Sequence, residues 1–291
     1  MSMLLAMALA MAGPTKADLK QLGPVKDTPT VQLDPNGAYI LLRSPAPVPI
    51  NLFRIATPDE VEDYKVRRAE ALAKAHKRWT SSHADWVKNK DTYRAQGMNV
   101  DEPVEPTEAN LAFPALDEEN LIGFGPLFRF AKEKGGNSTY LQRVWPGRYV
   151  VYGSILVNAS NGVATGFCVC MGTIAFDVKA GEIVDAGAVK ASVNDPLIYP
   201  RLLDKAEPGD VEGLRSGAIT MMRWSPKDGS MAIDPRLSSY KVTPAQFRPA
   251  GPVPNYFGVQ VDRMTAIPGI LGYDRDKLVD LSATPALNAA H

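Results

Sequence analysis

Two cysteines are the residues whose type and spacing could most readily do chemistry. They are Cys168 and Cys170, the only cysteines in the 291-residue chain, and the residues beside them are apolar. Side chains alternate along a strand, so residues two apart face the same side, with Ile174 and Phe176 expected further along that face. Three interpretations are open: buried free thiols that act as small hydrophobes, a local disulfide, or thiolate ligands that hold Cu(I) together with a methionine thioether.

Geometry favours the buried thiols. Two strand steps would place the Cα atoms about 6.6 Å apart, at the far limit for an unstrained bridge. A disulfide would nevertheless fit an oxidising compartment. Two ligands are too few for a metal site, and no histidine is near in sequence. The metal site at Cys168 and Cys170 therefore stays as the alternative, in which the protein handles copper or redox chemistry.

The histidines do not form a recognisable metal or catalytic pattern. His76 and His83 are seven residues apart and so share one helix face, but metal-binding pairs on a helix prefer a spacing of four. Lys77 and Arg78 lie beside them and would repel a cation, so we expect solvated helix residues. Phosphate loops, dinucleotide fingerprints and paired carboxylates are absent. The sequence thus nominates no catalytic residue and no cofactor, and we expect a protein that is not an enzyme.

The overall charge argues against nucleic acid as a partner. The chain has 32 basic and 32 acidic residues and an isoelectric point of about 6.8. A nucleic-acid-binding protein needs a sustained basic face to displace counterions.

The segment from Tyr140 to Val189 is the predicted core. It consists of runs rich in Val, Ile, Tyr and Phe, and turn residues break it at Pro146-Gly147, Asn158 to Gly162 and Ala180-Gly181. This is the pattern of consecutive β-hairpins. We expect a mainly β fold, an antiparallel β-sandwich over residues 37–191, with a Pro/Gly-rich C-terminal region, 192–291, that covers the sandwich.

Part of this core resembles a known pattern. Trp145-Pro146-Gly147-Arg148-Tyr149 and the later Lys179-Ala180-Gly181-Glu182 are similar to the Pro-Gly-x-Tyr strand and Ala-Gly hairpin of uncharacterised proteobacterial periplasmic proteins of the cell envelope. The resemblance covers about 50 residues and implies a small β-sandwich and an envelope location. It implies no active site.

A long α-helical insertion, 58–120, interrupts the β pattern. Thr57-Pro58-Asp59-Glu60 is a capping box with proline at the first helical position, and the pattern of apolar residues predicts a helix over 58–96, either continuous or kinked near Ser82. Residues 65–94 carry nine Lys/Arg against three Asp/Glu, and residues 101–119 carry seven acids and no base. We expect the acidic segment to run back along the helix as a strap. Its apolar residues should complete the seam of Trp79 and Trp86, with the acids facing the basic flank of the helix; these apolar residues are Val100, Leu111, Phe113 and Leu116. The alternative is a disordered acidic loop that leaves the helix free to meet anionic lipid.

The N-terminus predicts export. Met3 to Ala12 is an apolar run that ends in Ala10-Met11-Ala12, as in the apolar region and cleavage site of a signal peptide, although no Lys or Arg precedes it. An apolar helix docked on the core is the alternative. We expect residues 1–12 to be removed, residues 13–36 to form a polar leader outside the core, and the mature protein to be periplasmic without a transmembrane anchor.

These expectations define a function only by class. We expect a secreted envelope protein with a binding or structural role, which contacts an envelope protein or an anionic surface through helix 58–96.

Overall fold

The computed structural model describes residues 22–44, 49–125, 129–132, 138–158, 160, 162–191, 222–227, 231–275 and 277–283. The chain divides into two compact units, one formed by residues 1–55 and 120–291 and the other by residues 56–119. The predicted signal peptide 1–12 and the segment 192–221 lie outside the described residues.

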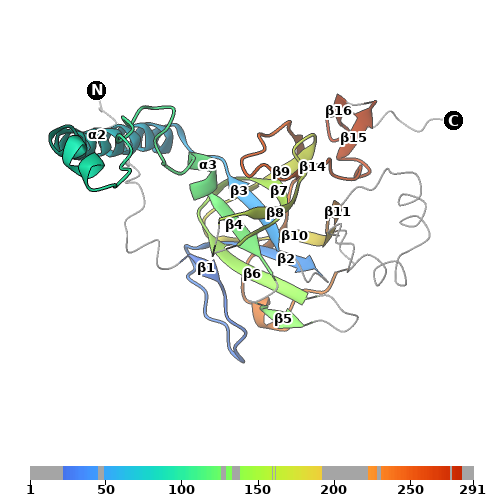
Figure 1. The fold of residues 1–291 in the computed structure, drawn as a ribbon. Helices are drawn as coiled ribbons and strands as arrows, with labels where there is room; N and C mark the ends of the chain where they lie inside the picture. The colour runs from blue at the N-terminus through green and yellow to red at the C-terminus, as the bar shows by residue number, and fades with distance from the viewer. Residues whose placement is uncertain are drawn as a thin grey trace, which may run out of the picture. The chain divides into compact units, whose positions relative to one another are not determined.

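The first unit contains two seven-stranded sheets and a small hairpin (Figure 1). The first sheet has the order β1-β6-β2-β10-β11, and β5 and β12 join it at β6 and β10. The second has the order β13-β9-β7-β3-β4, with β8 beside β7 and β14 beside β8. The strands of the first sheet are β1 (Gly23–Pro24), β2 (Ala38–Ser44), β5 (Ala131–Lys132), β6 (Ser138–Val144), β10 (Glu182–Ala191), β11 (Met222–Ser225) and β12 (Val242–Pro244). Those of the second are β3 (Ile50–Arg54), β4 (Leu121–Phe124), β7 (Gly147–Val157), β8 (Ala164–Cys168), β9 (Thr173–Val178), β13 (Arg248–Ala250) and β14 (Gln260–Val261).

The mainly β fold with one helical insertion is confirmed, but the sheets are mixed rather than purely antiparallel. Strand β10 pairs in parallel with β2 and β12, and β14 pairs in parallel with β8. Parallel neighbours need a crossover connection. The chain provides one by building most of the second sheet between β2 and β10.

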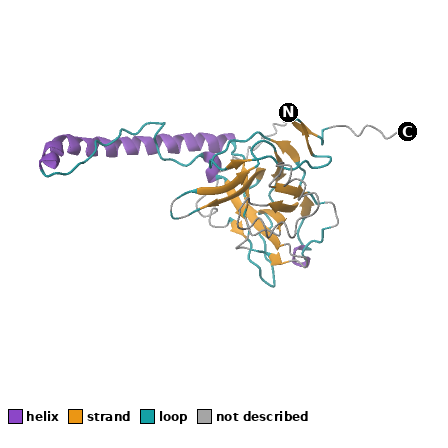
Figure 2. Ribbon diagram, turned by 45° about the vertical axis from the view of Figure 1, so that its right-hand side comes forward, coloured by secondary structure: helices purple, strands orange, loops and turns teal. Residues whose placement is uncertain are grey.

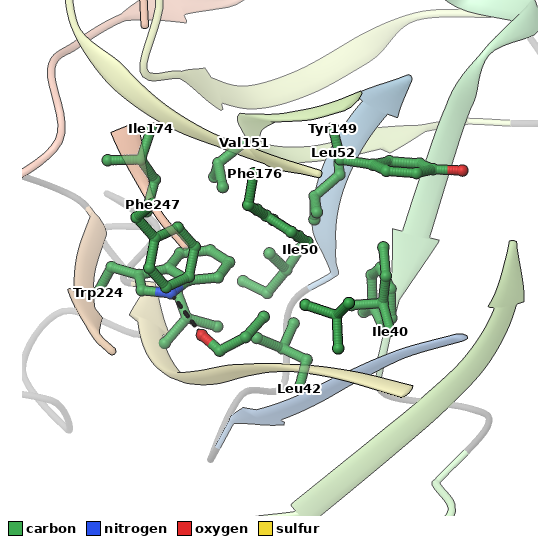
Figure 3. Packing of buried hydrophobic residues seen from close by; sticks show 14 of the residues in the cluster. Ile40, Leu42, Ile50, Leu52, Tyr149, Val151, Ile174, Phe176, Trp224 and Phe247 are labelled. Atoms are coloured by element: carbon green, nitrogen blue, oxygen red, sulfur yellow. Dashed lines mark hydrogen bonds between the residues drawn. The ribbon is translucent and has the colours of Figure 1, made fainter. Parts of the chain in front are cut away.

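The main core lies between the two sheets (Figure 3). Tyr149, Val151, Ile174 and Phe176 are buried there, as expected from the sequence. Ile155 is also buried, but it belongs to a second apolar cluster with Tyr152 and Cys168 rather than to the main core.

A glycine explains this change of face along β7. The pairing of β3 with β7 shifts register between Asn51 and Leu52, and Gly153 opposite this point has φ 154°. A Cβ on Gly153 would lie 2.1 Å from the Phe167 carbonyl oxygen. The strand therefore needs glycine at this position to pass close to β8.

A buried ionic cluster joins the first sheet to the segment after β11. Asp185 accepts hydrogen bonds from Arg43 Nη1 at 2.8 Å and from the Gly187 amide at 3.0 Å, and Lys227 Nζ lies 3.4 Å from its other oxygen. Arg43 and Asp185 are 3% and 0% exposed. Buried charges are tolerated only when they are paired and hydrogen-bonded. The pairing of Lys227 with Asp185 therefore holds the segment after β11 on the first sheet.

The leader is not a separate polar extension, and that prediction was wrong for its described part. Strand β1 pairs with β6, and Val25, Val31 and Leu33 pack against a buried cluster on the outer face of the first sheet. The alternating apolar residues of the leader supply this contact despite its polar composition.

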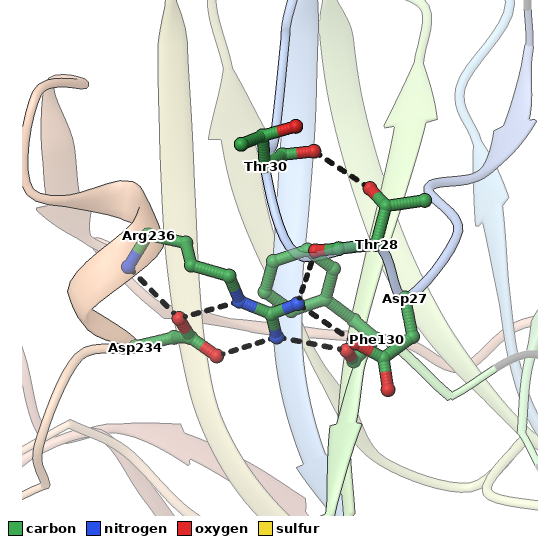
Figure 4. Close-up of polar contacts among 6 residues, drawn as sticks. All are labelled: Asp27, Thr28, Thr30, Phe130, Asp234 and Arg236. Atoms are coloured by element: carbon green, nitrogen blue, oxygen red, sulfur yellow. Dashed lines mark hydrogen bonds and ion pairs between the residues drawn. The ribbon is translucent and has the colours of Figure 1, made fainter.

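One arginine ties the leader to the C-terminal region (Figure 4). The Arg236 guanidinium donates to Asp27 Oδ1 at 2.7 Å, Asp234 Oδ2 at 2.8 Å and the Phe130 carbonyl at 3.1 Å, and it lies over the Phe130 ring. Hydrogen bonds from Arg236 lower the pKa of Asp234. Arg236 lies in a short 3₁₀ helix, Pro235–Leu237, and Asp234 is the N-cap residue of this helix.

The C-terminal region belongs to the first unit. Its strands β12, β13 and β14 extend the two sheets, and its hairpin β15 (Leu271–Asp274) and β16 (Lys277–Asp280) packs through partly buried residues against the main core. The C-terminal region thus covers the sandwich partly by adding strands to its two sheets.

The second unit is built on one helix, α2 (Pro58–Ala95), of 38 residues. The Thr57 hydroxyl accepts from the Glu60 amide, and the Glu60 carboxylate accepts from the Thr57 amide. The helix is continuous through Ser82, and Gly97 with φ 70° follows its end. The capping box predicted from sequence is therefore confirmed, and the helix ends one residue before the predicted end. No helix in the described ranges is long and apolar enough to cross a membrane.

Candidate interaction site on the helical unit

The segment 97–119, here called the strap, runs back along α2 (Figure 2). Two tryptophans one heptad apart hold its backbone: Trp79 Nε1 donates to the Pro103 carbonyl at 2.9 Å, and Trp86 Nε1 donates to the Val100 carbonyl at 3.0 Å. Every residue has a backbone carbonyl, so these two hydrogen bonds position the strap but do not depend on which side chains it carries.

Three glutamates of the strap face three basic residues of α2. Glu102 lies 3.0 Å from His83 Nε2, Glu105 lies 2.9 Å from His76 Nε2, and Glu108 accepts from Arg68 Nε at 2.8 Å. The hydrogen bond from Arg68 to Glu108 raises the pKa of Arg68. The two histidine contacts are ion pairs only when the imidazole is protonated.

The contacts repeat because two chain periods match. The glutamates recur every three residues in Glu-Pro-Val-Glu-Pro-Thr-Glu, 102–108, and three residues cover about 9.3 Å in a polyproline II conformation. The two tryptophans, like the two histidines, recur every seven residues, which cover about 10.5 Å in an α-helix. An extended strap can therefore meet successive turns of one helix face.

The other end of the strap packs on the start of α2. The Tyr64 hydroxyl donates to the Pro114 carbonyl at 2.8 Å, and its ring lies 5.5 Å from the Phe113 ring. Arg67 forms two hydrogen bonds with Glu119; these bonds raise its pKa. α3 (Leu116–Glu119) ends the unit.

The structure confirms the strap and corrects its chemistry. Leu111, Phe113 and Leu116 are half-buried as an apolar seam requires, but Val100 is 47% exposed and contributes its carbonyl instead. His76 and His83, expected to be solvated, are strap contacts. The three-residue spacing of the glutamates was the available sequence signal for this pairing.

The face of α2 turned away from the strap carries a basic patch. At about 100° per residue, Lys74, Lys77 and Lys88 lie about 140–180° around the helix from Trp79, and Arg78 lies about 100° from it. Within the described residues no ion pair involves Lys74, Lys77, Arg78 or Lys88, and all four are exposed. We call these four residues the outer patch. Asp85 is the one acid in this stretch of sequence, and it accepts a hydrogen bond from Asn89.

The cysteines lie in the first unit, and the structure joins them by a disulfide. Strand β8 ends at Cys168, and Cys170 lies in the turn that follows, so their Cα atoms are 5.1 Å apart. The prediction that Ile174 and Phe176 continue the same strand was wrong, since both belong to β9. The bond is the second of the three sequence interpretations.

The disulfide lies beneath the C-terminal region. Cys168 and Cys170 are 0% and 4% exposed, and their carbonyls accept from the Asp262 and Val253 amides at 2.8 and 2.9 Å. No group of three or more His, Cys, Asp or Glu that could hold a metal occurs among the described residues.

Comparisons with protein-family models, with curated proteins and with solved structures found no match. The resemblance to proteobacterial envelope proteins is therefore still a prediction.

Proposed function

We propose that this is a secreted envelope protein that acts by binding, and that the outer patch of α2 is its contact surface for an acidic protein. The observation that carries the proposal is that the four cations of the outer patch form no ion pair within the described residues. The other described arginines of this unit each form an ion pair with an acid of the same unit. The patch runs from Lys74 to Lys88, about 21 Å of helix, which suits an acidic strand or helix.

The chemistry of the outer patch favours a protein partner over a lipid surface. A helix that lies in a membrane interface buries an apolar face, but the aromatic face of α2 is covered by the strap. The residues between the four cations include Ser81, Ala84 and Asp85, none of which would insert into lipid.

The disulfide supports the proposed export to the periplasm. Disulfides persist in oxidising surroundings such as the periplasm and are rare in the cytosol. A buried Cys168–Cys170 bond is therefore consistent with export, together with the apolar run that ends at Ala12.

Photo-crosslinking in the native host tests the binding role. With a photoreactive residue at Ser81, we expect one discrete protein adduct in the envelope fraction, and a loss of about fivefold or more in Lys77→Glu/Lys88→Glu. The matched control, Lys179→Glu/Lys277→Glu, reverses two exposed charges in the first unit and should leave the adduct unchanged. An adduct insensitive to the outer-patch reversal, or binding to anionic vesicles instead, would contradict the proposal.

A second function, redox or copper chemistry at Cys168 and Cys170, is favoured by the disulfide itself. A redox partner or Cu(I) would have to reach sulfurs that the 253–262 segment covers. Thiol titration of the folded protein after mild reductant measures this: release of two thiols, followed by tight Cu(I) uptake, would support this alternative over the inert bond.

A further inference from the structure

We propose that docking of the strap on α2 is controlled by protonation of His76 and His83. The sequence has three histidines, and two of them occupy equivalent places one heptad apart, each opposite a strap glutamate. The third basic position of the ladder is Arg68, which keeps its charge at every pH of interest. Two of the three ladder contacts therefore change charge when the imidazole is protonated.

Each histidine ring lies against a strap glutamate and against one or two tryptophan rings. His76 has Glu105 at 2.9 Å and the Trp79 ring at 5.3 Å. His83 has Glu102 at 3.0 Å and lies between the Trp79 ring at 5.0 Å and the Trp86 ring at 6.1 Å, nearly parallel to both. Indole faces attract cations.

No charged residue lies three or four positions from either histidine on the helix. The positions three and four residues from either histidine hold Leu, Ala, Trp, Thr and Val. Lys77 is adjacent to His76 in sequence but points about 100° away around the helix. Lys90, one heptad beyond His83, lies over the Trp86 ring. Asp101, next to Glu102 in sequence, is a further exposed acid of the strap.

The direction of the pH effect follows from these contacts. Each contact is an ion pair when the imidazole is protonated and the glutamate ionised, and at most a neutral hydrogen bond when the imidazole is neutral. Strap docking should therefore be stronger under mildly acidic than under mildly alkaline conditions.

The consequence for binding rests on the proposed function. Helices draw most of their stability from tertiary packing, and the strap is the packing partner that α2 has within its unit. The outer patch keeps its spacing only while α2 is helical, so mild acidification would strengthen the contact with the acidic partner.

The indole protons of Trp79 and Trp86 report docking directly, because both donate to strap carbonyls. We would measure their solvent-exchange protection by NMR on the full chain at pH 5.5 and 7.5, normalised to free tryptophan at each pH. We expect protection to rise about fivefold at pH 5.5, the combined effect of two exposed ion pairs. Equal protection at the two pH values in the wild-type protein would overturn the proposal.

Variants separate the histidines from other titrating groups. His76→Gln/His83→Gln keeps a hydrogen-bond donor but carries no charge, and its protection should not change with pH. Arg68→Gln, the matched control, should lower protection equally at both pH values and leave the ratio near fivefold. A ratio that persists in the double glutamine variant would also overturn the proposal. The Ser81 crosslink is scored separately: if protection titrates but no adduct forms, the proposed function fails and the protonation effect stands.

Discussion

At the residue scale, the buried carboxylate of Asp185 makes the sharpest prediction for stability. Removing it in Asp185→Ala leaves Arg43 buried without its counter-charge, which costs roughly 3–5 kcal/mol in similar buried pairs. Urea unfolding of the two proteins measures the difference. The exposed Asp177→Ala, in the same region of sequence, should change the free energy of unfolding by less than about 0.5 kcal/mol.

A double variant tests the reason for that loss. If the cost comes from the uncompensated charge, Arg43→Leu/Asp185→Leu should recover most of it, because apolar residues often replace buried ion pairs without loss. A double variant no more stable than Asp185→Ala would show that backbone contacts such as the Gly187 amide dominate instead.

A tyrosine gives the pH dependence of the first unit. Burial raises the pKa of Tyr273 from 10 to about 12, and its hydroxyl donates to the Met264 carbonyl at 2.8 Å. The unfolded chain ionises near pH 10 while the folded protein does not, so stability should fall as the pH rises from about 10 to 12. Tyr273→Phe should cost about 1 kcal/mol at pH 7 and remove this part of the alkaline loss. An unchanged alkaline slope in denaturant titrations of the variant would show that Tyr273 does not carry the effect.

Residue identity alone predicted some of this chemistry and missed the rest. The cysteine pair was visible in the sequence, but its geometry depends on β8 ending at Cys168, and a change from strand to turn over two residues has no clear signal in apolar sequence. Asp185 appears in a hairpin-like run and gives no sign of burial, because its partner Arg43 is 142 residues away.

At the element scale, α2 and its strap are the best-predicted parts of the chain. The start and end of the helix follow from local chemistry, namely Thr57, Glu60 and Gly97, which acts over a few residues. Opposite charge and sufficient chain length predicted the strap. The roles of the indole N–H groups and of the histidines were missed because they depend on the register between two elements, which composition does not define.

The indole contacts predict how the strap responds to a single lost bond. Trp79→Phe keeps the ring stacked on His83 but removes the donor to the Pro103 carbonyl, a loss of about 0.5–1.5 kcal/mol. A strap held less tightly should be cut by a glutamyl endopeptidase about 2- to 10-fold faster. The bond to follow is Glu108–Ala109, since Glu102 and Glu105 both precede proline and resist cleavage. Tyr93→Phe, which keeps its ring, is the control and should leave the rate unchanged. Equal rates in all three proteins would mean that the Trp79 bond does not hold the strap.

At the scale of the whole molecule, the mixed sheets explain where prediction from sequence stopped. Periodicity and turn residues located β7, β9 and β10 in the predicted core, since each is a short-range pattern. The parallel pairing of β10 with β2 joins residues about 145 positions apart, and the pairing of β1 with β6 joins residues about 120 apart. Such pairings are decided by the packing of the complete core, so the leader could not be assigned to the sheet beforehand.

The two units should fold independently, and a deletion tests this. The helical unit is inserted between β3 and β4, which pair as adjacent antiparallel strands with Phe53 opposite Leu121. The Arg54 amide also donates to the Asn120 carbonyl at 3.2 Å, so both ends of the insertion are already held together. Replacing residues 56–119 with Asn-Gly would join the strands by a three-residue loop, with Ile55 as its first residue, of a length common in hairpins.

We expect the shortened protein to keep its two-sheet core, since all residues of the main cluster lie outside the deleted segment. Thermal unfolding followed by near-ultraviolet circular dichroism should shift by no more than a few degrees, because shortening a loop changes its closure entropy only slowly with length. The deletion should also leave the disulfide intact, as thiol titration would show. A protein that loses its cooperative transition on deletion would instead reveal that the helical unit stabilises the sheets, and would argue against a separate contact element.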